Sequence, residues 1–211
     1  MAFPLWTRHS HMRVAPLLTF VLLTAACIPA QSHGQVDPSW LRSWNEAQET
    51  RPKKLTSSSR IAAVNEPGAP LIVSGQVFEP DGTPAQSVVV HAYHRDANGF
   101  DFGPDDSSLT TWRLQGWVKT DAAGRFDFAT IRPAPDHLGR EGGHIHFTTE
   151  SKAYGRQWAP KVFFADDPML TDEQHQRSAE AGRFAWIREV ETTNDIQRIS
   201  VAIQLKKESD F

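Results

Sequence analysis

The sequence predicts an all-β protein, an antiparallel β-sandwich that follows an export segment and a short N-terminal arm. From residue 71 onward, short runs rich in β-branched and aromatic residues alternate with turn signals that contain Gly, Pro, Asp or Asn. About seven such runs at regular spacing are typical of a sandwich. No Gly-rich loop joins a predicted strand to a helix, so a nucleotide-binding fold is not indicated.

The composition agrees with one globular domain plus short appendages. The chain has 211 residues, of which 39% are hydrophobic and 22% charged, and this balance excludes a wholly disordered chain. The net charge is −3, and it becomes −5 without residues 1–26, which hold two arginines and no acid, so nucleic acid is not an expected partner. The single cysteine, Cys27, excludes an internal disulfide.

Residues 1–26 predict an export signal. Arg8 and Arg13 precede an apolar run of 13 residues, which is shorter than the roughly 20 residues that a membrane-spanning helix needs. Residues 23–27 resemble a bacterial lipobox, in which Cys27 would carry the lipid, and the alternative is ordinary cleavage near Ala30. We therefore expect a periplasmic protein or a membrane-anchored lipoprotein that touches the membrane only through its lipid.

Residues 27–70 form a polar arm in which one helix is expected. Ser39 is a suitable N-cap, and Trp40, Leu41 and Trp44 then lie on one side of a helix over residues 38–50. The Pro-, Lys- and Ser-rich residues 52–59 are typical of a linker. The simplest expectation is an arm that packs its tryptophans on the main domain.

The sandwich is expected over residues 71–211. Predicted strands cover residues 71–78, 87–93, 116–120, 125–131, 143–150, 159–164, 184–191 and 196–206. The turn at 121–124 predicts a hairpin between its two neighbouring strands. A late helix is expected over residues 171–182, because Thr171 and Gln174 are spaced as a capping box and Gly182 is a typical helix stop.

His144 and His146 are the main candidates for chemistry. On a strand, residues two apart share a face, so this pair suits a grip on one metal ion, and imidazole with carboxylate ligands would suit iron or manganese, with zinc as an alternative. Asp136 and His137 lie shortly upstream. The other interpretation is a pair of surface or hydrogen-bonded histidines. A Ser–His–Asp hydrolase stays open, although the chain has no Gly-x-Ser-x-Gly elbow.

Five segments resemble, in order and spacing, the intradiol ring-cleavage dioxygenases, the family of protocatechuate 3,4-dioxygenase and catechol 1,2-dioxygenase. They are residues 74–84, 88–99, 120–133, 144–147 and 161–168, and the resemblance runs from about Leu71 to Leu170. It implies a β-sandwich core, a catechol-type substrate with dioxygen, and a non-haem Fe(III) held by two tyrosines and two histidines.

The resemblance assigns site residues and also exposes departures. His144 and His146 match the family's histidine ligands. The two tyrosine positions fall on Asp101, or Phe100 if the register shifts by one, and on Asp136. These aspartates would be metal ligands or bases in a rebuilt site. Alternatively they mark a decayed site in a polar loop.

The family's arginine and glutamine have changed as well. The arginine corresponds to Arg140, one residue out of place, and the glutamine to Lys161, so these two are the candidates for binding substrate or stabilising charge. The chain's only tyrosines, Tyr93 and Tyr154, lie away from the ligand positions. Other candidate contributors are Asp105, Asp106, His94 and His137.

A second hypothesis is a non-catalytic sandwich module or lipoprotein that has lost the metal site. Trp112, Trp117 and Trp158 would then form a carbohydrate- or peptide-binding surface, whereas the simpler interpretation makes them core aromatics. The geometry separates the two hypotheses. Convergence of Asp101 and Asp136 on the histidine pair would favour the metal-dependent oxygenase.

Overall fold

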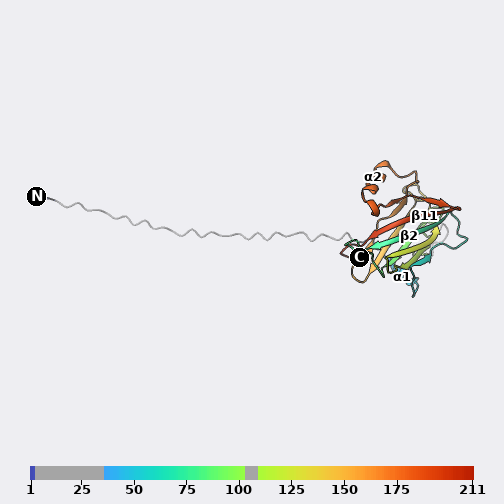
Figure 1. Cartoon of the computed structure of the whole chain (residues 1–211), viewed down its shortest axis with the longest axis horizontal. Coiled ribbons are helices and arrows are strands. Elements are labelled where there is room, and N and C mark those ends of the chain that lie inside the picture. The colour runs from blue at the N-terminus through green and yellow to red at the C-terminus, as the bar shows by residue number, and fades with distance from the viewer. Residues whose placement is uncertain (3–35, 103–108) are drawn as a thin grey trace. The chain divides into compact units, whose positions relative to one another are not determined.

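The computed structural model describes residues 1–2, 36–102 and 109–211, and the predicted export signal, Cys27, Asp105 and Asp106 lie outside these residues. The fold is a sandwich of two sheets with two helices at its periphery (Figure 1). No helix of the described residues is long and apolar enough to cross a membrane.

The first sheet has five strands in the order β1-β5-β2-β11-β10. Their bounds are β1 Ser58–Arg60, β2 Pro70–Phe78, β5 Arg125–Ile131, β10 Glu191–Thr193 and β11 Ile196–Gln204. The second sheet has the order β4-β3-β6-β8-β9, and β7 pairs with β6 off this path. Its strands are β3 Val89–His94, β4 Leu114–Lys119, β6 His144–Ser151, β7 Gly155–Trp158, β8 Val162–Phe164 and β9 Ile187–Arg188.

The core lies between the two sheets, as the period-two pattern of the strands predicts. Strands β2, β5 and β11 contribute Leu71, Val73, Phe126, Phe128, Ile199 and Val201, and strands β3, β4, β6 and β8 contribute Val90, Val118, Ile145, Phe147 and Phe164. Every one of these side chains is at most 5% exposed. The outer faces are left for helices, loops and polar groups, and the outer face of the six-stranded sheet carries the candidate site.

Two predictions about strand pairing are wrong. The sandwich is mixed, because β1–β5, β2–β11 and β8–β9 are parallel pairs. Long stretches of chain separate β2 from β11 and β8 from β9, so these strands can lie beside their partners in the same direction, which a tight turn does not allow. Strands β4 and β5 form no hairpin either, since the turn at 121–124 carries the chain from one sheet to the other.

The helices fall where they are expected, with a correction at one cap. Helix α1 spans Pro38–Glu49, and its N-cap is Asp37, whose carboxylate accepts the N–H groups of Ser39 and Trp40, rather than Ser39. Helix α2 spans Asp172–Glu180 with the predicted capping box of Thr171 and Gln174. A short 3-10 helix, η1 (Gly182–Phe184), follows α2, so the strand expected over residues 184–191 shrinks to β9.

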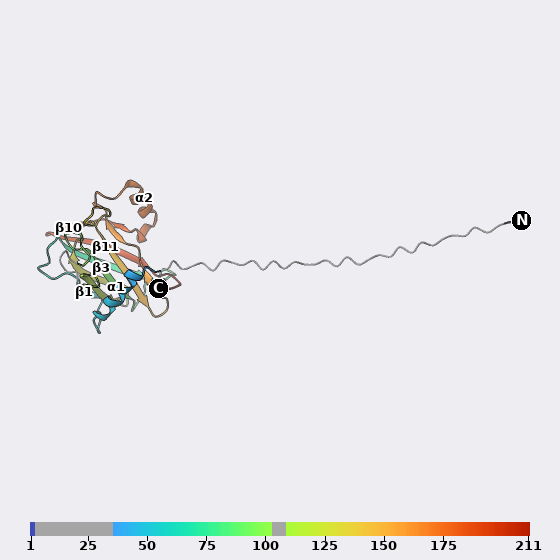
Figure 2. The same ribbon diagram turned by 180° about the vertical axis from the view of Figure 1, so that it is seen from behind.

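The N-terminal arm is part of the sandwich. Residues 58–60, expected within a linker, form β1 and pair with β5. Helix α1 packs Trp44 and Ala47 against Tyr93, Trp112 and Trp117, on the outer face of the six-stranded sheet (Figure 2). The arm therefore covers the sheet face on which the candidate site lies.

Candidate functional site

Two histidines on β6 form the centre of the site. Side chains alternate along β6, so Ile145 and Phe147 enter the core while His144 and His146 lie on the outer face. The two Nε2 atoms are 2.9 Å apart. Nδ1 of His144 lies 2.8 Å from the carbonyl oxygen of Gly142. A carbonyl only accepts, so Nδ1 carries the proton and donates it, and Nε2 of the neutral ring keeps a free lone pair.

Burial keeps both imidazoles in the neutral form. Desolvation lowers the pKa of His144, and it lowers the pKa of His146 well below 6.5. Neutral imidazole is the metal-binding form. Two Nε2 atoms that face each other across this distance fit two ligands of one cation.

An aromatic layer adjoins the histidines. Tyr93 on β3 is the cross-strand partner of His146, and the two rings are parallel within 2°, with centroids 4.6 Å apart. The Tyr93 hydroxyl accepts a hydrogen bond of 2.8 Å from Nε1 of Trp40 on α1. Burial raises the pKa of Tyr93, so this side chain is a neutral phenol held by helix α1 rather than a phenolate.

A cavity of about 630 Å³ opens beside the aromatic layer. Its lining consists of Asp37, Ser39, Trp40, Ser43, Phe102, Trp112 and Trp158. Trp112 stacks on Tyr93 with centroids 3.7 Å apart, so one side chain separates the cavity from His146. Trp112 and Trp117 are buried and Trp158 is half-buried. An exposed surface made of all three tryptophans is therefore wrong, and the interpretation as core aromatics holds for the first two.

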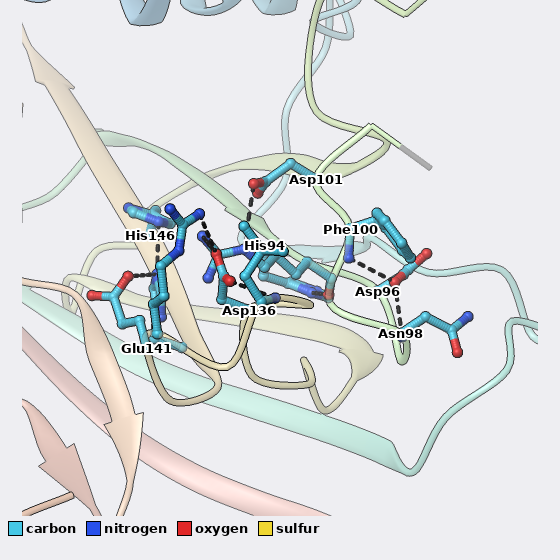
Figure 3. Close-up of polar contacts among 12 residues, drawn as sticks. His94, Asp96, Asn98, Phe100, Asp101, Asp136, Glu141 and His146 are labelled. Atoms are coloured by element: carbon cyan, nitrogen blue, oxygen red, sulfur yellow. Dashed lines mark hydrogen bonds and ion pairs between the residues drawn. The ribbon is translucent and has the colours of Figure 1, made fainter. Parts of the chain in front are cut away.

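The loop that carries Asp101 is built by a local turn. The Asp96 carboxylate accepts the N–H groups of Asn98 and Phe100 (Figure 3). Gly99 has a φ of 84°, and a Cβ at this position would lie 2.2 Å from the carbonyl oxygen of Pro135. Glycine thus lets this turn approach the segment that carries Asp136.

Asp101 and Asp136 converge on an arginine. Oδ2 of Asp101 lies 3.3 Å from Nε of Arg95, and Oδ2 of Asp136 lies 3.6 Å from Nη2 of the same side chain. Asp136 also accepts the N–H of Leu138 at 2.7 Å, which is the main cause of its lowered pKa. Neither carboxylate is within hydrogen-bond distance of His144 or His146. The sequence predicted the two aspartates and missed the arginine between them.

Glu141 is the only described carboxylate within ion-pair distance of either histidine of the pair. Its Oε2 lies 3.7 Å from Nε2 of His144, and its Oε1 lies 2.6 Å from Nζ of Lys161. Lys161 therefore reaches the site through Glu141. Arg140 contacts Oδ2 of Asp136 at 3.5 Å, and its side chain is 70% exposed, so it lies at the rim.

The remaining candidates have structural positions. His94 points into the molecule, where its Nε2 lies 2.7 Å from the Thr130 hydroxyl and its Nδ1 lies 2.7 Å from the carbonyl oxygen of Arg95. His137 stacks on Phe100 with centroids 4.6 Å apart. Neither side chain contacts the histidine pair.

The family's iron can be tested against these residues. The imidazole half fits, because the neutral rings of buried His144 and half-buried His146 bring their Nε2 atoms within 2.9 Å of each other. The two tyrosinate ligands of the family have no equivalent here. The Tyr93 hydroxyl is hydrogen-bonded to Trp40, and Asp101 and Asp136 form ion pairs with Arg95. Across the described parts of the chain, no group of three or more His, Cys, Asp or Glu side chains is arranged to hold a metal ion.

Comparison with known proteins bears on this site. The family model described as "Dioxygenase" matches residues 47–206. The chain is 30% identical over 127 residues to catechol 1,2-dioxygenase 1 of Acinetobacter lwoffii, covering 52% of this chain and 40% of the relative. It is 29% identical over 126 residues to the protocatechuate 3,4-dioxygenase beta chain of Burkholderia cepacia, covering 55% and 54%. The chain thus spans about half, or less, of the length of these curated relatives.

Solved structures agree on the fold. The dioxygenase domain of a dioxygenase carbohydrate-binding protein fusion from Streptomyces sp. SirexAA-E superposes with a TM-score of 0.54 at 20% identity, covering 74% of this chain and 91% of that one. Catechol 1,2-dioxygenase from Acinetobacter sp. ADP1 gives a TM-score of 0.53 at 19% identity, covering 81% and 71%. At these identities the likeness concerns the sandwich and its topology.

Proposed function

Because the chain belongs to the intradiol ring-cleavage dioxygenase family, we propose that it is an exported, metal-dependent oxygenase that acts on a catechol-type aromatic diol with dioxygen. The observation that carries this proposal is the pair of buried His144 and half-buried His146, whose two Nε2 atoms are 2.9 Å apart. The family generally uses non-haem iron, and we propose iron here with an altered set of anionic ligands.

His144 and His146 would hold the iron, and Glu141, whose Oε2 lies 3.7 Å from Nε2 of His144, is the carboxylate that would have to move toward the pair to become a third ligand. Two histidines and one carboxylate form a ligand set that non-haem iron uses in other oxygenases. When bound, the iron would supply the redox chemistry between the diol and dioxygen. In this assignment Lys161, 2.6 Å from Glu141, orients that carboxylate and offsets negative charge on a bound diol. Arg140, at the rim, supports Asp136.

The aromatic cavity beside the pair supports a flat aromatic substrate. Indole and phenyl rings of Trp40, Trp112 and Phe102 line it, and such rings bind another aromatic ring by stacking or edge contacts. The ring of a diol in this cavity would then lie against Trp112, with Tyr93 between Trp112 and His146.

The first test is metal content with a matched variant. We expect the full chain, purified from an iron-supplemented culture, to hold about one metal per chain, and His144→Ala to lose it while keeping its circular dichroism spectrum. His137→Ala is the matched control, because His137 stacks on Phe100 away from the pair. Metal-free protein with an intact fold would contradict the proposal.

The second test is oxygen consumption with a panel of catechols. We expect uptake that depends on His144 and His146, and no intense visible band from phenolate bound to ferric iron, because Tyr93 is a neutral phenol bonded to Trp40. A deeply coloured ferric protein would show that a tyrosine reaches the metal and that the assigned ligand set is wrong.

A further inference from the structure

Arg95 follows strand β3 and lies beneath the surface between two loops. Its side chain is 16% exposed, and its guanidinium contacts Asp101 through Nε and Asp136 through Nη2. Nη1 is buried and has no hydrogen-bond partner among the described residues. A guanidinium that is largely out of water and flanked by two carboxylates is a fixed positive charge.

The same charge acts on the histidine pair. Tyr93 and His94 of β3 pair with His146 and Ile145 of β6, so Arg95, the next residue, follows in the register opposite His144. A fixed cation at this position repels a metal ion held by the pair, and the repulsion is larger for a divalent ion than for a monovalent one. Asp101 and Asp136, which would attract a metal ion, are already paired with Arg95.

We infer that Arg95 is a tethered cation that occupies both aspartates, so that Asp101 and Asp136 do not ligate the metal and Arg95 lowers the metal affinity of the histidine pair. The inference rests on the proposed function in that it concerns the same pair. It assigns the aspartates at the family's tyrosine positions to an internal ion pair. Metal binding is then left to His144, His146 and Glu141.

The test removes the charge and measures affinity for a metal alone. We would titrate Mn²⁺ into wild type, Arg95→Met and Arg95→Met/Asp136→Asn by calorimetry, using the full chain. Removing one nearby positive charge and freeing two carboxylates should raise Mn²⁺ affinity by about tenfold or more. The double variant should lose part of that gain, because one of the two freed carboxylates is gone while Asp101 remains. Unchanged or weaker binding in Arg95→Met would overturn the inference.

Two variants control for charge and folding. Arg140→Met removes a guanidinium that contacts the same Asp136 oxygen from an exposed position, and we expect less than about a threefold change because solvent screens it. If Arg95→Met does not fold, Arg95→Lys carries the test. The lysine keeps the charge and loses the planar fork, so it should hold only one aspartate and bind Mn²⁺ about threefold tighter than wild type. Affinity at or below wild type would again contradict the inference.

The outcomes separate the inference from the proposed function. If wild type binds metal and Arg95→Met shows no gain in Mn²⁺ affinity, the inference is contradicted and the proposed function is not. Metal bound by Arg95→Met but absent from wild type isolated from iron-supplemented culture supports the inference and contradicts the function. No metal in either protein contradicts both.

Discussion

Two buried histidines outside the candidate site make the fold sensitive to acid. His91 stacks on Trp117 with centroids 4.4 Å apart, and His94 bonds to Thr130 in the interior. Burial lowers the pKa of His91 to about 3 and the pKa of His94 to about 4. An unfolded chain titrates its histidines near 6.5.

The sign of the pH effect follows. Between about pH 4 and 6.5 the unfolded chain binds protons that the folded protein excludes, so the free energy of unfolding falls as the pH falls. The slope should approach about 1.4 kcal/mol per pH unit for each histidine. Urea unfolding at pH 7.0, 6.0 and 5.0 measures it. His94→Gln should reduce the slope by the contribution of one histidine, since His144 and His146, whose pKa values are also lowered, add to it as well. Stability that does not change over this range would contradict the argument.

Some residues of the site can be predicted from the sequence, whereas others are identified only in the folded structure. His144 and His146 are visible in the sequence, because two residues apart on a strand means one face. Arg95 and Glu141 are not, since their partners come from loops that only the folded chain brings together. The resemblance to the dioxygenase family pointed to Asp101 and Asp136, because they fall at the tyrosine positions. That resemblance does not tell which cationic side chain lies beside them.

At the scale of elements, the start of helix α1 offers a matched pair of variants. Asp37 caps the helix through the N–H groups of Ser39 and Trp40. The hydrogen bond that its carboxylate accepts from the Ser39 hydroxyl, followed by these two bonds, lowers the pKa of this exposed carboxyl. Asp37→Ala should destabilise the protein by about 1 kcal/mol, whereas Ser39→Ala should cost less than about half of that. If urea unfolding shows that the two variants lose equal free energy of unfolding, the assignment of the N-cap to Asp37 rather than Ser39 is contradicted.

Local sequence signals predicted the positions of helices and strands better than they predicted which strands pair with each other. Alternation located β2, β3, β5 and β6, and capping signals located α1 and α2. Strands β1 and β7 were not predicted because they are short and polar. They are stabilised by pairing with β5 and β6, and their own sequences show no strand pattern. The parallel partners could not be predicted, since direction and register depend on contacts between residues far apart in the sequence.

At the scale of the whole molecule, export is the feature to test in cells. We propose that residues 1–26 direct export, and Cys27→Ser separates the two fates of the mature chain. We expect both proteins to leave the cytoplasm of a bacterial host. If Cys27 is lipidated, wild type fractionates with membranes and Cys27→Ser is released; if cleavage falls near Ala30, both are released. An uncleaved cytoplasmic chain would contradict the proposed export.

The parallel pairing of β11 with β2 also sets an order in time. Residues 197–204 pair with residues 71–78, and β11 lies between β2 and β10 in its sheet. During synthesis, β2 emerges long before β11 and lacks this neighbour until residues 197–204 have left the ribosome. Pairings this distant close late and slowly. A nascent chain therefore cannot complete the five-stranded sheet until β10 and β11 have been synthesised, and this delay would suit the export that we propose.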